Sequence, residues 1–281
     1  ELARVNSVQE SFIQAGDATI ALQPIFALET DGEVGFFEST LRITRTPDPH
    51  FHVRLLSLAE ELGMIHRIDM HVLALTVDTL RRNPGMKASF NVSQRSILED
   101  GQQIIRRLAA SQVSERLIVE ITESTEIPTA WVAVFAAGVR EVGCKLAVDD
   151  FETGFADELL VRAVKPDLIK VVIDDTTLRY RERISRTLAL AKEIGADVVG
   201  EKIDSDEKIQ LLKVMGVRYL QGFSLASPIM NNDLPGIFGR SLDSTIPVND
   251  GSAPGIRLDL ARSFQPLNGH RQVRLVEKAG S

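Results

Sequence analysis

Two adjacent carboxylates, Asp149 and Asp150, follow an apolar run at 146–148 that is typical of a short buried strand. Each charge raises the pKa of the other unless a cation neutralises both. Acids in this position can also cap the N-terminus of a following helix. The pair alone is compatible with a helix cap or a cation site, so the rest of the chain must decide between them.

Polar side chains also stand at or near the ends of most other predicted strands. They are Glu38, Arg42, Asn91, Glu120, Glu123, Lys170, Glu201 and Gln221. A closed β/α barrel brings the carboxyl ends of its strands to one mouth, where acids from at least four strands would repel one another. Carboxylate and amide oxygens suit Mg²⁺ or Mn²⁺. Two such ions can lower the pKa of water and clamp a phosphodiester for in-line attack.

Each of these residues also has a structural interpretation. Lys170 lies inside an apolar run, where it could stabilise developing charge, although a surface lysine is the alternative. Glu201 follows Gly200 in an apolar strand, where an unpaired acid is costly. Asn91 and Gln221 could equally be turn residues at strand ends.

The composition of the 281 residues is that of an ordinary globular protein, with 44% hydrophobic and 25% charged residues. A net charge of −7 argues against binding to long nucleic acid, because proteins that bind its phosphates are usually basic. The single cysteine, Cys144, excludes an internal disulfide. No apolar run reaches the length of a membrane span, about 18 residues. We expect a cytoplasmic location. Because the chain opens at Glu1 without Met, the cytoplasmic part of a larger, membrane-anchored protein is the alternative.

Hydrophobic periodicity predicts eight strands and a series of helices. The strands are expected at 18–28, 34–43, 87–93, 117–123, 145–151, 167–173, 197–203 and 219–226. The helices are expected at 55–83 with a break near Gly63, and at 97–111, 128–142, 157–164, 176–194 and 205–215. Asp204 is the expected N-cap of the last helix.

Eight strands that mostly alternate with helices favour an α/β fold, a modified TIM (β/α)8 barrel. The short polar link between the first two strands predicts an antiparallel hairpin, and so one antiparallel strand. An open doubly wound sheet is the alternative, without a Gly-rich nucleotide motif to support it. We expect a lead-in at 1–18, the barrel at 19–230, and a C-terminal extension at 231–281. That extension, with short strands at 255–260 and 272–278, would cover the barrel or bind a partner.

The order of several short motifs resembles the EAL domain family over residues 19–230. The motifs are Gln23-Pro24-Ile25, Glu38-Ser39-Thr40-Leu41-Arg42, Asn91-Val92-Ser93, Glu120-Ile121-Thr122-Glu123, Asp149-Asp150-Phe151, Lys170, Gly200-Glu201 and Gln221-Gly222-Phe223. The resemblance implies hydrolysis of the bacterial messenger cyclic di-GMP to a linear dinucleotide, with two Mg²⁺ or Mn²⁺ ions.

The resemblance also implies roles for individual residues. The metal ligands would be Glu38, Asn91, Glu120, Asp149 and Asp150, with Glu201 or Gln221 near the second ion. Lys170 and Glu201 would serve catalysis, and Glu123 would brace the loop after Asp150. The ligand would contact Gln23, Glu38, Arg42, Asn91, Asp150, Gln221, Phe223 and Pro228.

Several positions depart from the family pattern. The signature triplet is Glu-Ser-Thr, Glu152 replaces a glycine, Ala156 and Asp157 replace serines, Val172 replaces an acid, Lys202 replaces a glycine, and Ser227 replaces a basic residue. A glutamate fails at the position of Glu152 if that position needs positive φ. These changes favour weakened catalysis with a retained ligand pocket.

Three functions are therefore compatible with the sequence. We favour a cyclic di-GMP receptor with weak or no hydrolysis, acting in motility, flagellar or surface-attachment control. An active metal-dependent phosphodiesterase is the first alternative. A protein-interaction module without ligand is the second, and the retained Gln23, Arg42 and Gln221 argue against it. A homodimer and a protein partner are expected from the resemblance alone.

Overall fold

The computed structural model describes residues 17–30, 33–44, 51–122, 127–152, 155–174 and 178–234. Its strands are β1 (Ala18–Ala27), β2 (Glu33–Ile43), β3 (Ala88–Ser93), β4 (Leu117–Thr122), β5 (Lys145–Val148), β6 (Leu168–Val172), β7 (Asp197–Glu201), β8 (Tyr219–Leu220) and β9 (Ile229–Met230). Its α-helices are α2 (Phe51–Glu61), α3 (Ile65–Arg82), α4 (Gln94–Ala110), α5 (Thr129–Glu141), α6 (Phe155–Val164), α7 (Leu178–Ile194) and α8 (Asp206–Met215). Short 3-10 turns lie at Leu28–Thr30, Ser114–Arg116 and Asn231–Asp233.

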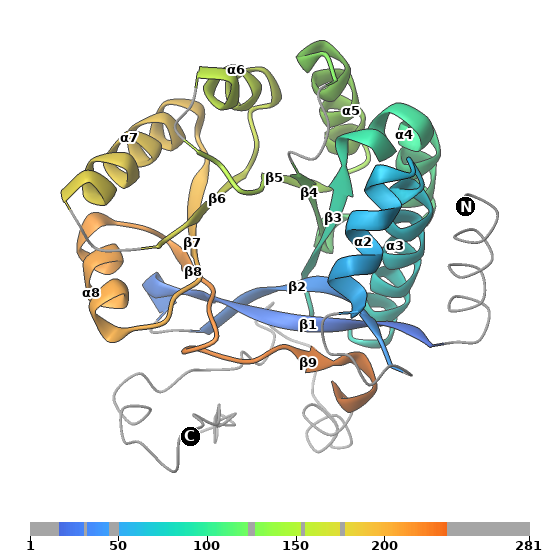
Figure 1. Cartoon of the computed structure of the whole chain (residues 1–281), viewed down its shortest axis with the longest axis horizontal. Helices are drawn as coiled ribbons and strands as arrows, with labels where there is room; N and C mark the ends of the chain where they lie inside the picture. The colour runs from blue at the N-terminus through green and yellow to red at the C-terminus, as the bar shows by residue number, and fades with distance from the viewer. Residues whose placement is uncertain are drawn as a thin grey trace, which may run out of the picture.

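The strands close into a barrel with helices around the outside (Figure 1). The order is β2-β3-β4-β5-β6-β7-β8-β1-β9, and a β1–β2 pairing closes the ring. Neighbours from β2 to β8 are parallel, whereas β1 is antiparallel to both β2 and β8. The predicted barrel with one antiparallel strand is therefore confirmed, and the open sheet is excluded.

A layer of apolar side chains fills the inside of the barrel. It consists of Ile25, Phe36, Ile118, Ala147, Leu168 and Val199, with Tyr219 packed against them. The outward-facing side chains of the strands join the helices in a larger core. These seven strands are thus apolar on both faces at this level, as strands buried on both sides must be, whereas β3 carries the buried Ser89 there. The layer blocks the barrel, so anything bound inside it must lie above, at the ends of the strands.

The predicted helices are present with shifted boundaries. The break near Gly63 separates α2 from α3, as expected. The expected cap of α8 is wrong, because Ser205 rather than Asp204 is its N-cap, and the Ser205 side chain accepts a hydrogen bond from the Lys208 amide. Asp204 instead lies 3.0 Å from the Lys208 ammonium. The sequence offered two adjacent capping residues, and only the backbone conformation chooses between them.

Two predicted strands are at least three residues shorter than expected, and one strand was missed. β5 ends at Val148, before the paired acids, and β8 ends at Leu220. β9 pairs with β1 at Ala21 and Leu22, beyond the β8 pairing at Phe26 and Ala27. Pro24 lies between these two pairings, where β1 needs no partner for its missing amide hydrogen.

Several predictions concern residues that the structure does not describe. The lead-in before Asp17, Glu123, and the extension after Leu234 with its two expected strands lie outside the described residues. The proposed division into three segments therefore stays a prediction. Within the described ranges, no helix combines the length and apolar character that a membrane span needs.

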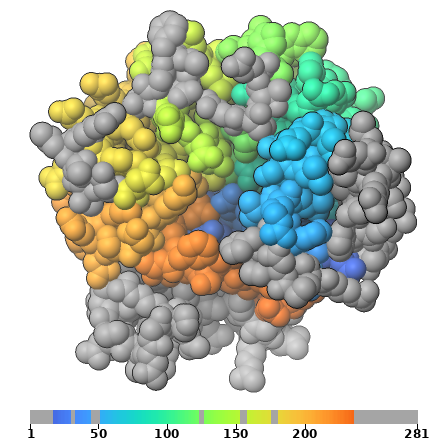
Figure 2. All heavy atoms as spheres, viewed as in Figure 1, coloured from blue at the N-terminus to red at the C-terminus, as the bar shows by residue number. Residues whose placement is uncertain are grey.

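The face of the molecule seen in Figure 1 is hollowed near its centre, beside α2 (Figure 2).

Candidate active site

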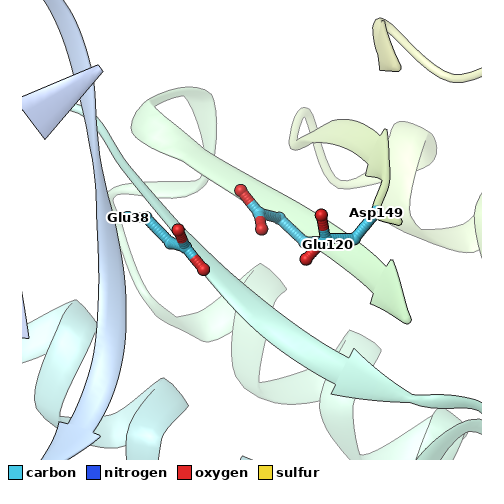
Figure 3. A group of neighbouring side chains, drawn as sticks. All are labelled: Glu38, Glu120 and Asp149. Carbon is cyan, nitrogen blue, oxygen red and sulfur yellow. The ribbon is translucent and has the colours of Figure 1, made fainter. Parts of the chain in front are cut away.

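A polar layer lies directly above the apolar layer inside the barrel. Because side chains alternate along a strand, a residue two positions from an inward-facing one also faces the barrel axis. The pairs are Phe36 and Glu38, Ile118 and Glu120, Ala147 and Asp149, Leu168 and Lys170, Val199 and Glu201, and Tyr219 and Gln221. In the antiparallel β1, Gln23 comes two residues before Ile25. The fold therefore carries the predicted polar residues to one place, and Figure 3 shows three of these carboxylates side by side.

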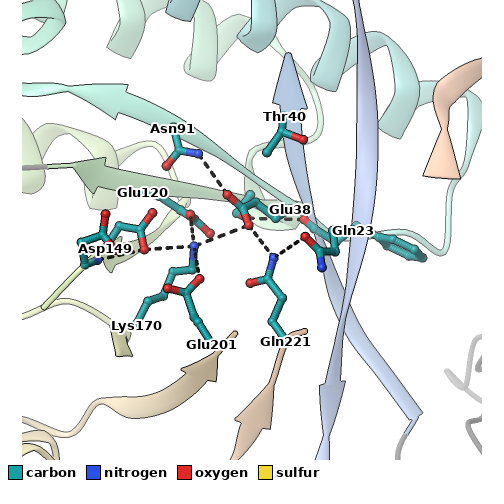
Figure 4. Close-up of polar contacts among 12 residues, drawn as sticks. Gln23, Glu38, Thr40, Asn91, Glu120, Asp149, Lys170, Glu201 and Gln221 are labelled. Carbon is teal, nitrogen blue, oxygen red and sulfur yellow. Dashed lines mark hydrogen bonds and ion pairs between the residues drawn. The ribbon is translucent and has the colours of Figure 1, made fainter. Parts of the chain in front are cut away.

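Lys170 is the centre of this layer (Figure 4). Its side chain is 1% exposed, and its Nζ lies 2.7 Å from Glu120 Oε2. The other carboxylates around it are Glu201 at 2.9 Å, Asp149 at 3.1 Å and Glu38 at 3.6 Å. One ammonium group thus faces four carboxylates from four other strands or strand ends. A fully ionised cluster of this kind is short of positive charge.

Glu38 is held from its other side by neutral amides. Asn91 Nδ2 donates to Glu38 Oε1 over 3.1 Å, and Gln221 Nε2 donates to Glu38 Oε2 over 2.6 Å. The same Gln221 nitrogen lies 3.2 Å from Gln23 Oε1. These contacts hold the Glu38 carboxylate toward Lys170, with both of its oxygens occupied.

The electrostatics of the cluster follow from burial and crowding. Burial raises the pKa of Glu120, and the nearby Glu38 and Asp149 raise it further, against the attraction of Lys170. Burial also raises the pKa of Glu201. For Lys170, burial lowers the pKa, but the surrounding carboxylates outweigh it and the pKa lies well above its usual value. The lysine is therefore charged, while the acids are under pressure to take up protons or cations.

The paired aspartates both reach the cavity because the backbone turns between them. Asp150 has a left-handed backbone with φ +50, and its amide donates to Asp149 Oδ1 over 2.9 Å. Aspartate tolerates this conformation better than most residues. The Asp149 amide still bonds to Ile121 O, and the Phe151 amide to Lys170 O. The turn is thus fixed between β4 and β6, and it ends β5 where the sequence had predicted three more strand residues.

Two groups of carboxylates have ligand atoms close enough to share a cation. The first is Glu38, Glu120 and Asp149, and the second is Asp149, Asp150 and Glu201, each with its oxygens within 4.8 Å of one another. Asp149 belongs to both. Three oxygens of the layer, Asn91 Oδ1, Glu120 Oε1 and Gln221 Oε1, are buried and have no hydrogen-bond partner among the described residues. Orphaned acceptors beside crowded carboxylates suit a hard cation such as Mg²⁺ or Mn²⁺.

A cavity of about 600 Å³ opens onto this layer. It is lined by Leu56, Glu60, Ile65, Asp69, Asn91, Ser93, Thr122, Asp149, Asp150, Phe151, Glu152, Val172, Asp174, Arg183 and Lys202. Its volume falls within the range of small-molecule sites, roughly 300 to 1,000 Å³. The cavity extends from α2 to α7, well beyond the carboxylates, so the site has room for a ligand larger than a metal-bound water.

Most of the predicted site residues come together, but three do not join the network. No direct hydrogen bond or ion pair links Arg42, Phe223 or Pro228 to the carboxylates in the described part of the chain. The Arg42 guanidinium donates to the Leu41 carbonyl, and burial lowers its pKa. Phe223 is 74% exposed beyond β8. Their predicted contacts with a ligand stay predictions, and Glu123 lies outside the described residues.

Asp69 is a cavity residue that the sequence did not indicate. It lies on α3, accepts hydrogen bonds from the Ser93 amide (2.9 Å) and from Ser96 Oγ (2.6 Å), and is buried. It thereby holds the end of β3 and the start of α4, two residues beyond Asn91. Burial raises its pKa to about 6. The only signal was an acid on the apolar face of a helix.

The backbone resolves two of the departures noted in the sequence. Glu152 does not have a positive φ, so a side chain is tolerated there. Lys202 does, with φ +54. The position after Glu201 therefore carries the strain that a glycine would avoid.

Comparisons with known proteins give a consistent family. The family model described as the EAL domain matches residues 5–228. The probable cyclic di-GMP phosphodiesterase PdeA of Escherichia coli K12 is 28% identical over 242 residues, which cover 80% of this chain and 32% of that protein. The chain spans about a third of the length of the first curated relatives that it matches.

Solved structures share the fold. The EAL domain of Xanthomonas citri FimX, determined in complex with cyclic di-GMP, matches with a TM-score of 0.70 and 20% identity, covering 81% of this chain and 94% of that one. Klebsiella pneumoniae BlrP1, in a complex with manganese and cyclic di-GMP, matches with a TM-score of 0.65 and 22% identity, covering 76% of this chain and 57% of that one.

Proposed function

Since the chain belongs to the EAL domain family, we propose that it binds cyclic di-GMP in the cavity at the strand ends and hydrolyses one phosphodiester to give linear pGpG. The observation that carries this proposal is the polar layer, in which acids from β2, β4 and β7 and from the end of β5 surround Lys170, while the Asn91 and Gln221 amides hold Glu38. Relatives named as cyclic di-GMP phosphodiesterases and complexes of the same fold with cyclic di-GMP support the choice of ligand.

The donor set fits two divalent cations. Glu38, Asn91, Glu120 and Asp149 would hold one ion, and Asp149, Asp150 and Glu201 the other. All are hard oxygen donors, which favours Mg²⁺ or Mn²⁺, and the manganese complex of BlrP1 is consistent with this. When bound, such ions lower the pKa of water and neutralise phosphate charge.

The remaining residues of the layer would position the attacking water and the phosphate, accept a proton from the water, and hold Glu38 in place. Lys170, charged and buried, can donate hydrogen bonds to an attacking water or to the phosphate oxygens as negative charge develops. Glu201 lies 2.9 Å from its ammonium and can accept a proton from that water, because burial and then the nearby Asp149 and Glu38 raise its pKa. Gln221 and Gln23 would keep Glu38 in place.

A receptor with weak or no hydrolysis is the second candidate. It is supported by the cavity residues Val172 and Lys202, where the family resemblance implies an acid and a glycine. A lysine beside the second carboxylate group would compete with a cation for that place. In this role the domain would report cyclic di-GMP to a protein partner in motility or attachment control. Homodimerisation and a cytoplasmic location are further proposals that rest on the family.

One assay separates the two candidates. The purified chain is incubated with cyclic di-GMP with and without Mn²⁺, and both bound ligand and linear product are measured. Manganese-dependent turnover on the order of 1 per second or faster supports the phosphodiesterase. Binding with little or no product supports the receptor, and the absence of binding overturns both.

Variants test which residues take part. Glu38→Ala should weaken binding of Mn²⁺ or ligand, because it removes a carboxylate common to Lys170, Asn91 and Gln221. Glu99→Ala is the control, since Glu99 forms an exposed ion pair with Arg95 on α4. Unchanged metal binding, ligand binding and turnover in Glu38→Ala would remove Glu38 from the site.

A further inference from the structure

Two cations line the cavity on the side away from β2 and β3. Among the described lining residues, Arg183 and Lys202 are the only basic ones, and they stand among six carboxylates. Neither forms an ion pair within the described chain. A basic side chain in an acidic cavity would ordinarily form an ion pair with a neighbouring carboxylate. The lack of such a pair suggests that these two side chains bind an anionic ligand instead.

Arg183 is held in place by neutral groups. Its Nη2 donates to the Val172 carbonyl over 2.7 Å, and its guanidinium lies 4.6 Å from the centre of the Tyr180 ring. Tyr180 is itself fixed by a 2.7 Å hydrogen bond to Asp174. The Arg183 Nε is buried and has no acceptor in the part of the chain that the structure describes. The guanidinium is therefore oriented, but only one of its N–H donors forms a hydrogen bond in the described chain.

Lys202 stands beside this group because of the sheet register. Val172, whose carbonyl binds Arg183, pairs with Glu201, and Lys202 follows directly. The left-handed backbone of Lys202 is strained for a residue with a Cβ. Lys202 is exposed, and its ammonium has no ion-pair partner among the described residues. A strained lysine and an oriented arginine thus share one edge of the cavity, at the ends of β6 and β7.

From this geometry we propose that Lys202 and Arg183 form a subsite for a phosphate group of the bound dinucleotide. The identity of the dinucleotide rests on the proposed function. A cyclic dinucleotide carries two phosphates, and the carboxylate centre with its two ions would engage the one to be cleaved. The second would still need positive charge from the chain. A guanidinium and an ammonium that line the same cavity without an ion pair in the described chain supply the charged donors that bind phosphate.

The first test measures ligand affinity. Cyclic di-GMP is titrated calorimetrically in Ca²⁺, an oxygen-seeking cation, and product formation is checked after each run. Lys202→Asn should weaken binding by roughly tenfold, the value of one charge-assisted hydrogen bond. Arg183→Gln should weaken binding at least as much, and Arg183→Lys less. Circular dichroism is used to check that each variant is folded.

Lys165→Asn is the matched control. Lys165 also has a left-handed backbone, with φ +48, but it lies between α6 and β6 and does not line the cavity. Asparagine relieves backbone strain at both positions, while only Lys202→Asn removes a charge from the cavity. Equal affinities of the wild type and Lys202→Asn would overturn the proposal.

A second measurement separates the subsite from the proposed function. Sulfate, which mimics phosphate, is titrated into the ¹⁵N-labelled chain in MgCl₂, and the Arg183 Nε–H resonance, assigned with Arg183→Lys, is followed. A saturable shift that Lys202→Asn weakens supports the subsite, even if cyclic di-GMP does not bind and the proposed function fails. No shift, or a shift that Lys202→Asn leaves unchanged, overturns it.

Discussion

The ammonium of Lys170 offsets the negative charge of four carboxylates, so its removal should change both the stability and the activity of the site. We expect Lys170→Met to lower the free energy of unfolding in EDTA by about 3 kcal/mol, the usual cost of breaking a buried ion pair. Turnover should fall at least a hundredfold. Because the acids remain, Mn²⁺ should restore part of the lost stability. Urea unfolding in EDTA and in Mn²⁺ measures both effects.

Lys208→Met provides a comparison for this prediction. Lys208 is also buried, but its ammonium bonds to the Ile173 carbonyl and to the exposed Asp204. Its loss should cost stability without any rescue by Mn²⁺. Equal rescue of the two variants would show that the electrostatic role assigned to Lys170 is wrong.

Asp69 should make stability depend on pH in an unusual direction. Burial raises its folded-state pKa from 3.8 to about 6, so the unfolded chain loses this proton first as the pH rises. The contribution of Asp69 to stability therefore falls between about pH 4 and 6, by about 3 kcal/mol in total, and stays constant above. Asp69→Asn lacks this term. Urea unfolding from pH 4 to 7 should show wild type losing stability relative to the variant, and a difference independent of pH would contradict it.

Single residues also mark the limit of prediction from sequence. Glu38, Glu120, Asp149, Lys170 and Glu201 could be predicted because each is a polar residue in or just after an apolar strand. Arg183 and Asp69 could not, because helix positions reveal no direction toward a cavity without the packing of the helix. Lys202 was visible only as a departure from the family pattern, and its left-handed backbone required the structure.

At the level of elements, the turn after β8 depends on a close backbone approach. A Cβ on Gly222 would overlap the backbone nitrogen and carbonyl oxygen of Ile203 and lie 2.7 Å from its carbonyl carbon. We expect Gly222→Ala to cost about 3 kcal/mol, as severe overpacking does. It should also displace Gln221, whose carbonyl accepts from the Ile203 amide, and so weaken ligand binding. Thermal unfolding and ligand titration check the two effects.

Gly195→Ala is the control for this variant. Gly195 ends α7 with φ +79, and a Cβ at this position would meet no other atom within 4 Å. Its substitution should cost only the conformational strain, about 1 kcal/mol, and leave ligand binding unchanged. Similar losses in both variants would indicate that the approach to Ile203 is not what requires glycine.

The ends of elements were less predictable than their existence. Alternation and apolar runs located all eight barrel strands, but not where β5 and β8 stop. β5 stops because Asp150 turns left-handed, and β8 stops at the contact between Gly222 and Ile203. β9 has two residues and exists only because β1 offers a free edge beyond β8. Such features depend on neighbours distant in sequence.

For the molecule as a whole, the crowded acids predict that cations stabilise the fold. At a concentration one hundred times its dissociation constant, Mn²⁺ should add about 2.7 kcal/mol, which raises Tm by several degrees for a chain of this size. Calorimetry in EDTA and in Mn²⁺ measures the shift. Asp149→Asn should abolish most of it, because Asp149 belongs to both carboxylate groups. Glu99→Gln should keep it in full, and an equal loss in both variants would argue against a site at Asp149.

The barrel itself could be predicted because its two layers repeat the same spacing on every barrel strand except β3, where Ser89 precedes Asn91. An apolar residue followed two positions later by a polar one puts an apolar layer inside the barrel and a polar layer above it, at the ends of the strands. The antiparallel β1 obeys the same rule in reverse, with Gln23 before Ile25. The cavity beyond the layer could not be predicted, since its walls come from α2, α3 and α7 as well as from the strands.

The reversed direction of β1 decides where the polypeptide enters the barrel. Ala18 pairs with Ile43 at the C-terminal end of β2. The first strand therefore begins at the rim that carries the polar layer, whereas the first strand of an all-parallel barrel begins at the opposite rim. Gln23 is five residues further on, roughly 17 Å along the strand, and pairs with Glu38. A single strand therefore connects the reactive rim, where β1 begins, to the carboxylate cluster.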